Sequence, residues 1–68
     1  MLLKINTEHI TLSQFLKLVG LIGTGGQAKD FIAQNPILVN GLVAEQRGKK
    51  LFPGDVVQVN KKVFTVTR

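Results

Sequence analysis

The chain has 68 residues, the length of one small domain with a small core, so we expect residues 1–68 to fold as a single unit. Its hydrophobic content of 44% argues against a disordered tail, and the absence of cysteine with one histidine argues against a disulfide framework or a zinc site. Nine Lys and Arg against four Asp and Glu give a net charge of +5, a balance typical of proteins that bind nucleic acid.

No apolar stretch has the length of a signal peptide or of a membrane span. The stretch at residues 1–3 is too short, and the run at residues 16–22 contains Lys17. We therefore expect a cytoplasmic protein with no membrane partner.

The first predicted helix begins at Thr11. Thr11 and Gln14 have the spacing of a capping box, in which the side chain of each residue accepts a hydrogen bond from the backbone N–H of the other. The apolar residues that follow recur at helical spacing and share one face: Leu12, Phe15, Leu16 and Val19. Lys17 falls on the opposite face, and Gly20 or Gly23 would end the helix.

A second helix is predicted from Thr24, where Gln27 repeats the capping-box spacing. Its apolar face consists of Ala28, Phe31 and Ile32. Asn35 suits the left-handed conformation that commonly closes a helix, and Pro36 prevents any continuation.

After Pro36 the pattern changes from helix to strand. Strands are predicted at residues 37–39, 42–44, 56–59 and 63–66, and the alternation at residues 3–5 indicates a further strand near the N-terminus. Asn40-Gly41 joins the first two, because this dipeptide best tolerates the positive φ values of a tight hairpin turn. The sequence thus predicts an α+β fold, with two short N-terminal helices packed on a small antiparallel β-sheet.

The start of the second helix carries two glycines. Gly25 and Gly26 leave its first backbone N–H groups without a side chain in the way, which makes a site for an anion such as phosphate. A basic loop follows at Arg47, Lys49 and Lys50, whose cations suit the phosphates of a nucleic acid. We expect the helix start and this loop to lie on one side of the molecule.

Gly23, Gly25 and Ala28 also match the spacing of a dinucleotide-binding loop, with Glu45 about twenty residues downstream. The context argues against this interpretation, because the apolar residues before Gly23 are expected to end a helix and not a strand. A chain of this length also cannot complete the doubly wound sheet of a dinucleotide-binding domain.

Taken in order, the two helix starts, the segment at residues 37–41 and the segment at residues 53–59 resemble the S4-type RNA-binding domain with its αL motif. The resemblance runs from about residue 10 to residue 59, and the whole chain is similar to small stand-alone bacterial members of that family. It implies non-catalytic binding of structured RNA, ribosomal or transfer RNA, with the ribosomal particle as a further partner. It implies no cofactor and no metal.

The resemblance and the charge pattern together select nine candidate RNA-binding residues. They are Lys17, Thr24, Gly25, Gly26, Lys29, Asn40, Arg47, Lys49 and Lys50. Thr11 and Gly25 occupy positions that are often filled by Arg in such domains. We therefore expect Gly25 to let a phosphate approach the backbone directly, in place of a contact with a cationic side chain.

Catalysis has no support in the sequence, since the four carboxylates are scattered and no histidine or cysteine can be paired with a nucleophile. The alternative function is that of a protein-interaction module docking on a larger assembly such as the ribosome. It would use an apolar patch around Leu18, Leu21 and Ile22, or an uncapped edge strand. In either case we expect a monomer.

Overall fold

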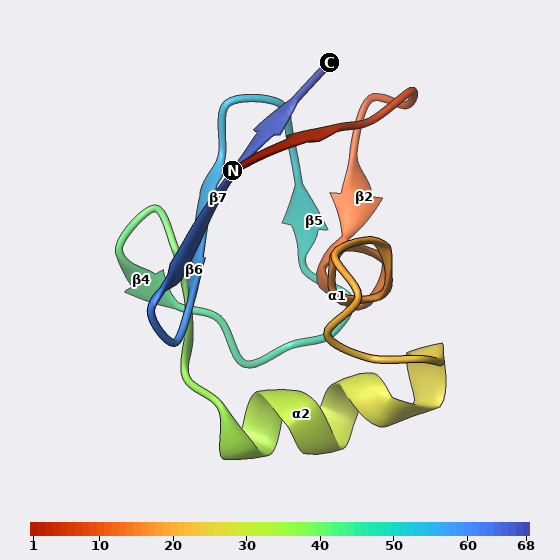
Figure 1. The fold of residues 1–68 in the computed structure, drawn as a ribbon, viewed down its shortest axis with the longest axis vertical. Coiled ribbons are helices and arrows are strands. Elements are labelled where there is room, and N and C mark those ends of the chain that lie inside the picture. Colours follow the sequence, from red (N-terminus) through yellow and green to blue (C-terminus); the bar gives the residue numbers. More distant parts are fainter.

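Two α-helices and seven β-strands make up the fold in the computed structural model, which describes residues 1–68 (Figure 1). The elements are β1 (Leu2–Lys4), β2 (Ile10–Thr11), α1 (Leu12–Leu18), the 3-10 turn η1 (Gly25–Gln27), α2 (Ala28–Gln34), β3 (Ile37–Val39), β4 (Leu42–Val43), β5 (Lys50–Leu51), β6 (Val56–Val59) and β7 (Lys62–Thr67). Five strands form one sheet in the order β1-β7-β6-β3-β4, and β2 pairs with β5 in a second, two-stranded sheet. Neither helix has the length and apolar character needed to cross a bilayer.

The predicted α+β class is confirmed, but the main sheet is mixed and not wholly antiparallel. The strand predicted near the N-terminus is β1, and it pairs with β7 in parallel, with Leu3 opposite Val66. All other neighbours in this sheet run antiparallel. Hairpin turns fix the direction only of strands that follow each other in the sequence. Since β1 and β7 lie at opposite ends of the chain, no turn signal specified how they would pair.

The capping box predicted at the start of α1 is present. The Gln14 backbone N–H donates to Thr11 Oγ1 at 3.2 Å, and the Thr11 N–H donates to Gln14 Oε1 at 2.9 Å. At the second helix, Gln27 Oε1 accepts hydrogen bonds from the backbone N–H groups of Gly23 and Thr24. The chain then passes through η1 directly into α2, so the second helical segment begins where the spacing predicted.

The prediction that Asn35 takes the left-handed conformation is wrong. Its φ of −130° and ψ of 114° are extended, because the ring of Pro36 disfavours a helical conformation in the preceding residue. The left-handed asparagines are instead Asn40 and Asn60, which occupy the turns between β3 and β4 and between β6 and β7.

The core lies between the helices and one face of the main sheet (Figure 1). In α1 the apolar face predicted from the sequence is fully buried at Leu12, Phe15 and Leu16. The rings of Phe15 and of Phe64 on β7 pack edge to face, with centroids 5.2 Å apart and planes at 86°. Ala28 is the only fully buried residue of α2. Thus α1 is fixed firmly to the sheet, and it supports the segments that carry the candidate site.

Candidate nucleic-acid interface

The basic loop is held at the start of α1 by a pairing that the sequence did not predict. In the small sheet, Ile10 lies opposite Leu51 and Thr11 lies opposite Lys50. Each strand has only two residues, so neither shows the alternation by which strands are recognised. The only sequence feature that could have indicated this pairing is the apolar character of Ile10 and Leu51, which are both buried. A single apolar residue does not specify which strand it pairs with. The pairing brings the end of the basic loop alongside the N-cap of α1.

The backbone of this loop completes the hydrogen bonding of α1. The first N–H groups of a helix lack partners within the helix. Here the Leu12 N–H donates to the Lys49 carbonyl at 2.8 Å, and the Ser13 N–H donates to the Arg47 carbonyl at 2.9 Å. The structural role of the loop is therefore carried by its carbonyl groups, while the side chains of Arg47 and Lys49 are exposed to solvent.

The charges around the start of α1 are arranged against the helix dipole. Acidic side chains stabilise a helix N-terminus and basic ones destabilise it. The first turn of α1 has no acidic residue, whereas Arg47, Lys49 and Lys50 are all adjacent to it through the contacts above. The start of α1 therefore carries an excess of positive charge. A bound anion would neutralise this charge and stabilise the helix start.

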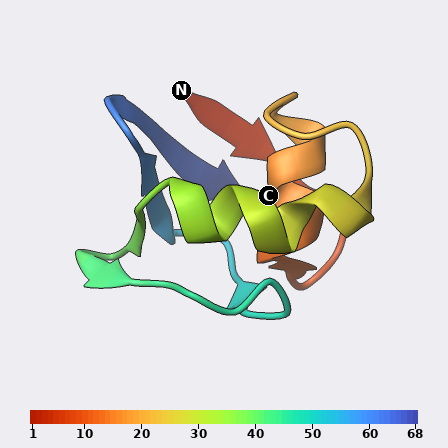
Figure 2. The same cartoon turned by 90° about the horizontal axis from the view of Figure 1, so that it is seen from below.

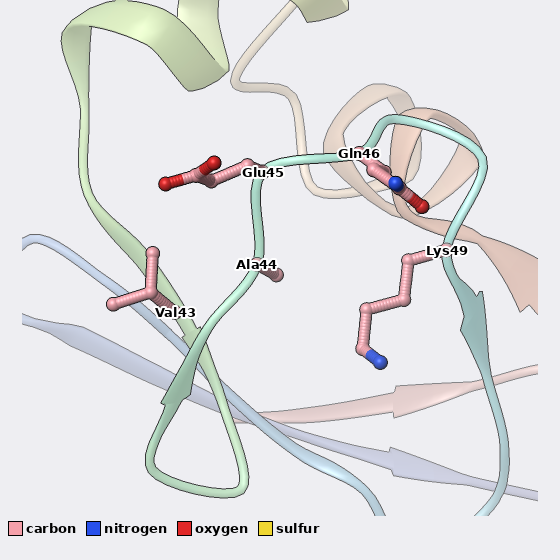
Figure 3. A pocket seen from close by; sticks show the side chains of 5 residues that line it. All are labelled: Val43, Ala44, Glu45, Gln46 and Lys49. Atoms are coloured by element: carbon pink, nitrogen blue, oxygen red, sulfur yellow. The ribbon is translucent and has the colours of Figure 1, made fainter.

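The connection between β4 and β5 also borders an open hollow of about 290 Å³ (Figure 3). Its lining consists of Val43, Ala44, Glu45, Gln46 and Lys49. In Figure 3 the Glu45 carboxylate and the Lys49 amine lie apart on the rim of this hollow, and they form no ion pair. Glu45 lies in this connection, beyond the end of β4.

The two glycines of η1 are not explained by packing. A Cβ atom built on Gly25 would meet no atom within 4 Å, and one on Gly26 would meet only Thr24 Oγ1, at 3.9 Å. Neither glycine has a positive φ. Close packing of the second helix on the first therefore does not require them. Figures 1 and 2 place η1 beside α1, on the same side of the molecule as the basic loop.

The two remaining lysines lie on exposed helix surfaces. Lys17 is in the last turn of α1, where it lines a shallow hollow together with Ile10, Gln14 and Leu18. Lys29 is in the first turn of α2, directly after η1. The structure thus gathers the candidate residues of the helices and of the loop around α1.

Asn40 lies apart from this group and has a structural role. Figures 1 and 2 show the β3–β4 hairpin at the end of the molecule away from α1 and η1. The Asn40 side chain donates to Asp55 Oδ1 at 3.1 Å and accepts from the Val56 N–H at 2.9 Å. Its φ of 53° forms the hairpin turn. Both polar atoms of the amide are thus used to join the hairpin to the start of β6.

Replacing Asn40 by alanine should therefore destabilise the domain. The loss of left-handed tolerance and of two hydrogen bonds should lower the free energy of unfolding by about 2 kcal/mol. Urea unfolding followed by circular dichroism measures this. Asn40→Gly, which keeps the backbone freedom, should lose about half as much. An unchanged free energy of unfolding in Asn40→Ala would contradict this structural role.

The apolar patch considered for protein docking does not form. Ile22 is buried at 9% exposure and Leu21 is half-buried against the core, so only Leu18 of the three is exposed. The chain folds back after α1, where the N–H groups of Leu21 and Ile22 donate to the Leu16 carbonyl. This turn directs Ile22 inward, which helical spacing alone did not indicate.

These elements form a small α+β module with a cationic face. The face consists of the basic loop at the N-terminus of α1 and the start of the second helical segment beside it, and the mixed sheet lies behind them. The chain belongs to the S4 domain family, whose model matches residues 3–67. This match is wider than the predicted 10–59, because β1 and β7 complete the same sheet. The chain is also similar to a Bacillus subtilis (strain 168) protein described as "Probable ribosome maturation protein RlbA". The two are 49% identical over 57 residues, which cover 84% of this chain and 80% of that protein.

Proposed function

We propose that this protein binds structured RNA, ribosomal or transfer RNA, without catalysing a reaction on it, and that it acts in the cytoplasm on the ribosome or its precursors. Membership of the S4 domain family and the ribosome-maturation description of the relative support this proposal. The observation that carries it is the basic loop, whose carbonyl groups hold α1 while its cations face solvent without an acidic partner at the helix start.

In this proposal the loop supplies most of the phosphate contacts. Arg47 can hold two phosphate oxygens through its planar guanidinium group, and Lys49 and Lys50 act as point charges. Lys17 and Lys29 extend the cationic surface along the helices. The Thr24 N–H already donates to Gln27 Oε1, so the N–H groups of Gly25 and Gly26 receive a further phosphate, with the Thr24 side chain beside them.

The phenylalanines indicate that recognition does not rest on base stacking. Phe15 and Phe64 are buried, and Phe31 is packed against the core. Phe52 is about half exposed, and its ring centroid lies 5.6 Å from that of His9. Proteins that read single strands stack bases on exposed aromatic side chains. Recognition of shape and phosphates in a folded RNA fits this surface better.

The salt dependence of binding tests the proposal. Affinity for a tRNA and for a folded ribosomal RNA fragment is measured by fluorescence anisotropy at several salt concentrations. The logarithm of affinity should fall with the logarithm of salt by roughly 0.7 to 0.9 per phosphate contact, hence by about 3 for four contacts. An unstructured RNA of equal length should bind less tightly. A response that is flat with salt would contradict the proposal.

Enlarging Gly25 tests the part assigned to the helix start. Gly25→Val should fold normally, because a Cβ atom at this position meets no atom within 4 Å and Gly25 has no positive φ, yet it should weaken RNA binding about tenfold by blocking the backbone. Ala33→Val, on the exposed surface of the same helical segment, is the matched control and should leave affinity unchanged. If the two variants bound RNA with equal affinity, the glycines would not belong to the RNA interface, and the basic loop alone would remain as its candidate.

A further inference from the structure

The hollow beside the basic loop has a lining that phosphate contacts do not explain. It lies between the end of β4 and the start of β5, and its volume of about 290 Å³ is close to the lower end of the range for ligand pockets. Val43 and Ala44 give it an apolar wall, and Glu45, Gln46 and Lys49 give it a polar rim (Figure 3). A flat ring with polar groups along its edge suits such a lining.

The backbone around the hollow is held on both sides. The Ala44 N–H donates to the Ile37 carbonyl at 2.8 Å, and the Ala44 side chain is buried. On the other side, the Lys49 N–H donates to the Gln46 carbonyl at 3.1 Å, and the Lys49 carbonyl accepts the Leu12 N–H at the start of α1. The hollow is therefore fixed in place next to the proposed phosphate contacts of the basic loop.

Glu45 is the acidic residue on the rim of the hollow. Its carboxylate accepts no hydrogen bond within the chain and forms no ion pair with Lys49. A carboxylate repels phosphate, so Glu45 opposes the binding of an RNA backbone at the place where it lies. It can only accept hydrogen bonds, through two oxygens side by side. The RNA group that Glu45 can bind is therefore the donor edge of a base.

Guanine is the base whose edge matches a carboxylate. Its N1–H and N2–H₂ groups are neighbouring donors, so the two oxygens of one carboxylate can accept from both at once. Cytosine and adenine offer one amino group next to an acceptor nitrogen, which a carboxylate repels, and uracil offers one N–H between two carbonyl groups. Pairing occupies this edge of guanine in a stem, so only an unpaired guanine in a loop, a bulge or an end exposes it.

We propose that the hollow binds an unpaired guanine of the RNA, with Glu45 accepting from its N1–H and N2–H₂ groups and Val43 packing against the ring. Val43 is 65% exposed, so its side chain is free for this contact, and Lys49 holds an adjoining phosphate. The inference rests on the proposed RNA binding and adds selectivity for one base to it. A basic protein segment is the other possible occupant beside Glu45, but Lys49 and the net charge of +5 repel it.

Selection from a pool of RNA hairpins tests the inference. The hairpins share one stem and have randomised loops, and the loops are sequenced before and after capture on the protein. The natural protein should enrich guanine about tenfold at one loop position. Glu45→Gln, which keeps the size of the side chain but has one acceptor oxygen in place of two, should abolish this enrichment. Glu8→Gln removes the same charge from the exposed connection between β1 and β2, and this matched control should keep the enrichment.

Affinities for single hairpins, measured by fluorescence anisotropy, separate the outcomes. Glu45→Gln should bind a guanine loop about tenfold more weakly but an all-uridine loop at least as tightly, because the cationic face has lost a negative charge beside it. Inosine lacks the N2 amino group of guanine and should weaken binding in the natural protein only. Binding without a preference for guanine, or a preference that Glu45→Gln keeps, would overturn the inference and leave the proposed RNA binding intact. If no hairpin bound, both would fail.

Discussion

The double variant Arg47→Glu/Lys49→Glu should bind structured RNA about 100-fold more weakly than the natural protein and should still fold. Each reversal removes a phosphate contact and adds a repulsion of similar size. Folding should be preserved because these residues hold α1 through their carbonyl groups, which the substitutions keep. The slope of the logarithm of affinity against the logarithm of salt should also decrease by about 1.5, the value expected for two lost contacts.

The matched control is Lys61→Glu/Lys62→Glu, which makes the same change in net charge at the β6–β7 turn. Anisotropy titrations of both variants against the same RNA fragment separate a local effect from a general one. The control should lose affinity only to the extent that the overall positive field attracts RNA, and this part is strongly screened at physiological salt. Equal losses in the two variants would mean that RNA responds to net charge and not to the basic loop.

The features that could be predicted from the sequence depend on residues close together in the chain. The capping box requires only Thr11 and Gln14, three positions apart, and both of its hydrogen bonds are present. The turn at Asn40-Gly41 has φ values of 53° and 84°, as its dipeptide predicted. In such motifs the side chain acts on its own backbone, so the fold as a whole has little influence on the outcome.

The arrangement of the candidate site could not be predicted in the same way. The N–H groups of Leu12 and Ser13 find their acceptors in the basic loop, which is distant in the sequence. No local pattern indicates that a loop will supply carbonyl groups to a helix, because every residue type has one. The charge pattern therefore identified the cationic residues, but only the fold brings them to the start of α1.

Asparagine shows a related difficulty in assigning roles. Asn35 and Asn40 both suit turns, and the amide of either can also contact RNA, so residue type alone leaves the role open. In the fold, Pro36 sets the conformation of Asn35, and Asp55 and Val56 occupy the amide of Asn40. Asp55 and Val56 lie far from Asn40 in the sequence, so no local pattern indicated their hydrogen bonds. Pro36 is adjacent to Asn35, and its restriction on the preceding residue outweighed the preference of asparagine for the left-handed conformation.

The second large effect is expected in the core, where Phe15→Ala should leave the domain largely unfolded at 37 °C. Phe15 is fully buried and packs edge-to-face on Phe64. Truncating such a residue lowers the free energy of unfolding by about 3–5 kcal/mol. The single hydrophobic core of a domain this short rarely supplies more than about 3–5 kcal/mol of stability, so one cavity removes most of it. Circular dichroism during urea and thermal unfolding measures the loss.

Phe52→Ala is the matched control, because the same side chain is removed where it is 48% exposed. Its free energy of unfolding should fall by no more than about 1 kcal/mol, since half of the ring already contacts water. Phe15→Ala should also lose RNA binding, because α1 and the basic loop hold each other through the Leu12 and Ser13 hydrogen bonds. If Phe15→Ala remained folded yet lost RNA affinity, the side chain would act in the interface directly. If the free energy of unfolding fell no further in Phe15→Ala than in Phe52→Ala, this would contradict the claim that the packing of α1 on the sheet holds the basic loop in place.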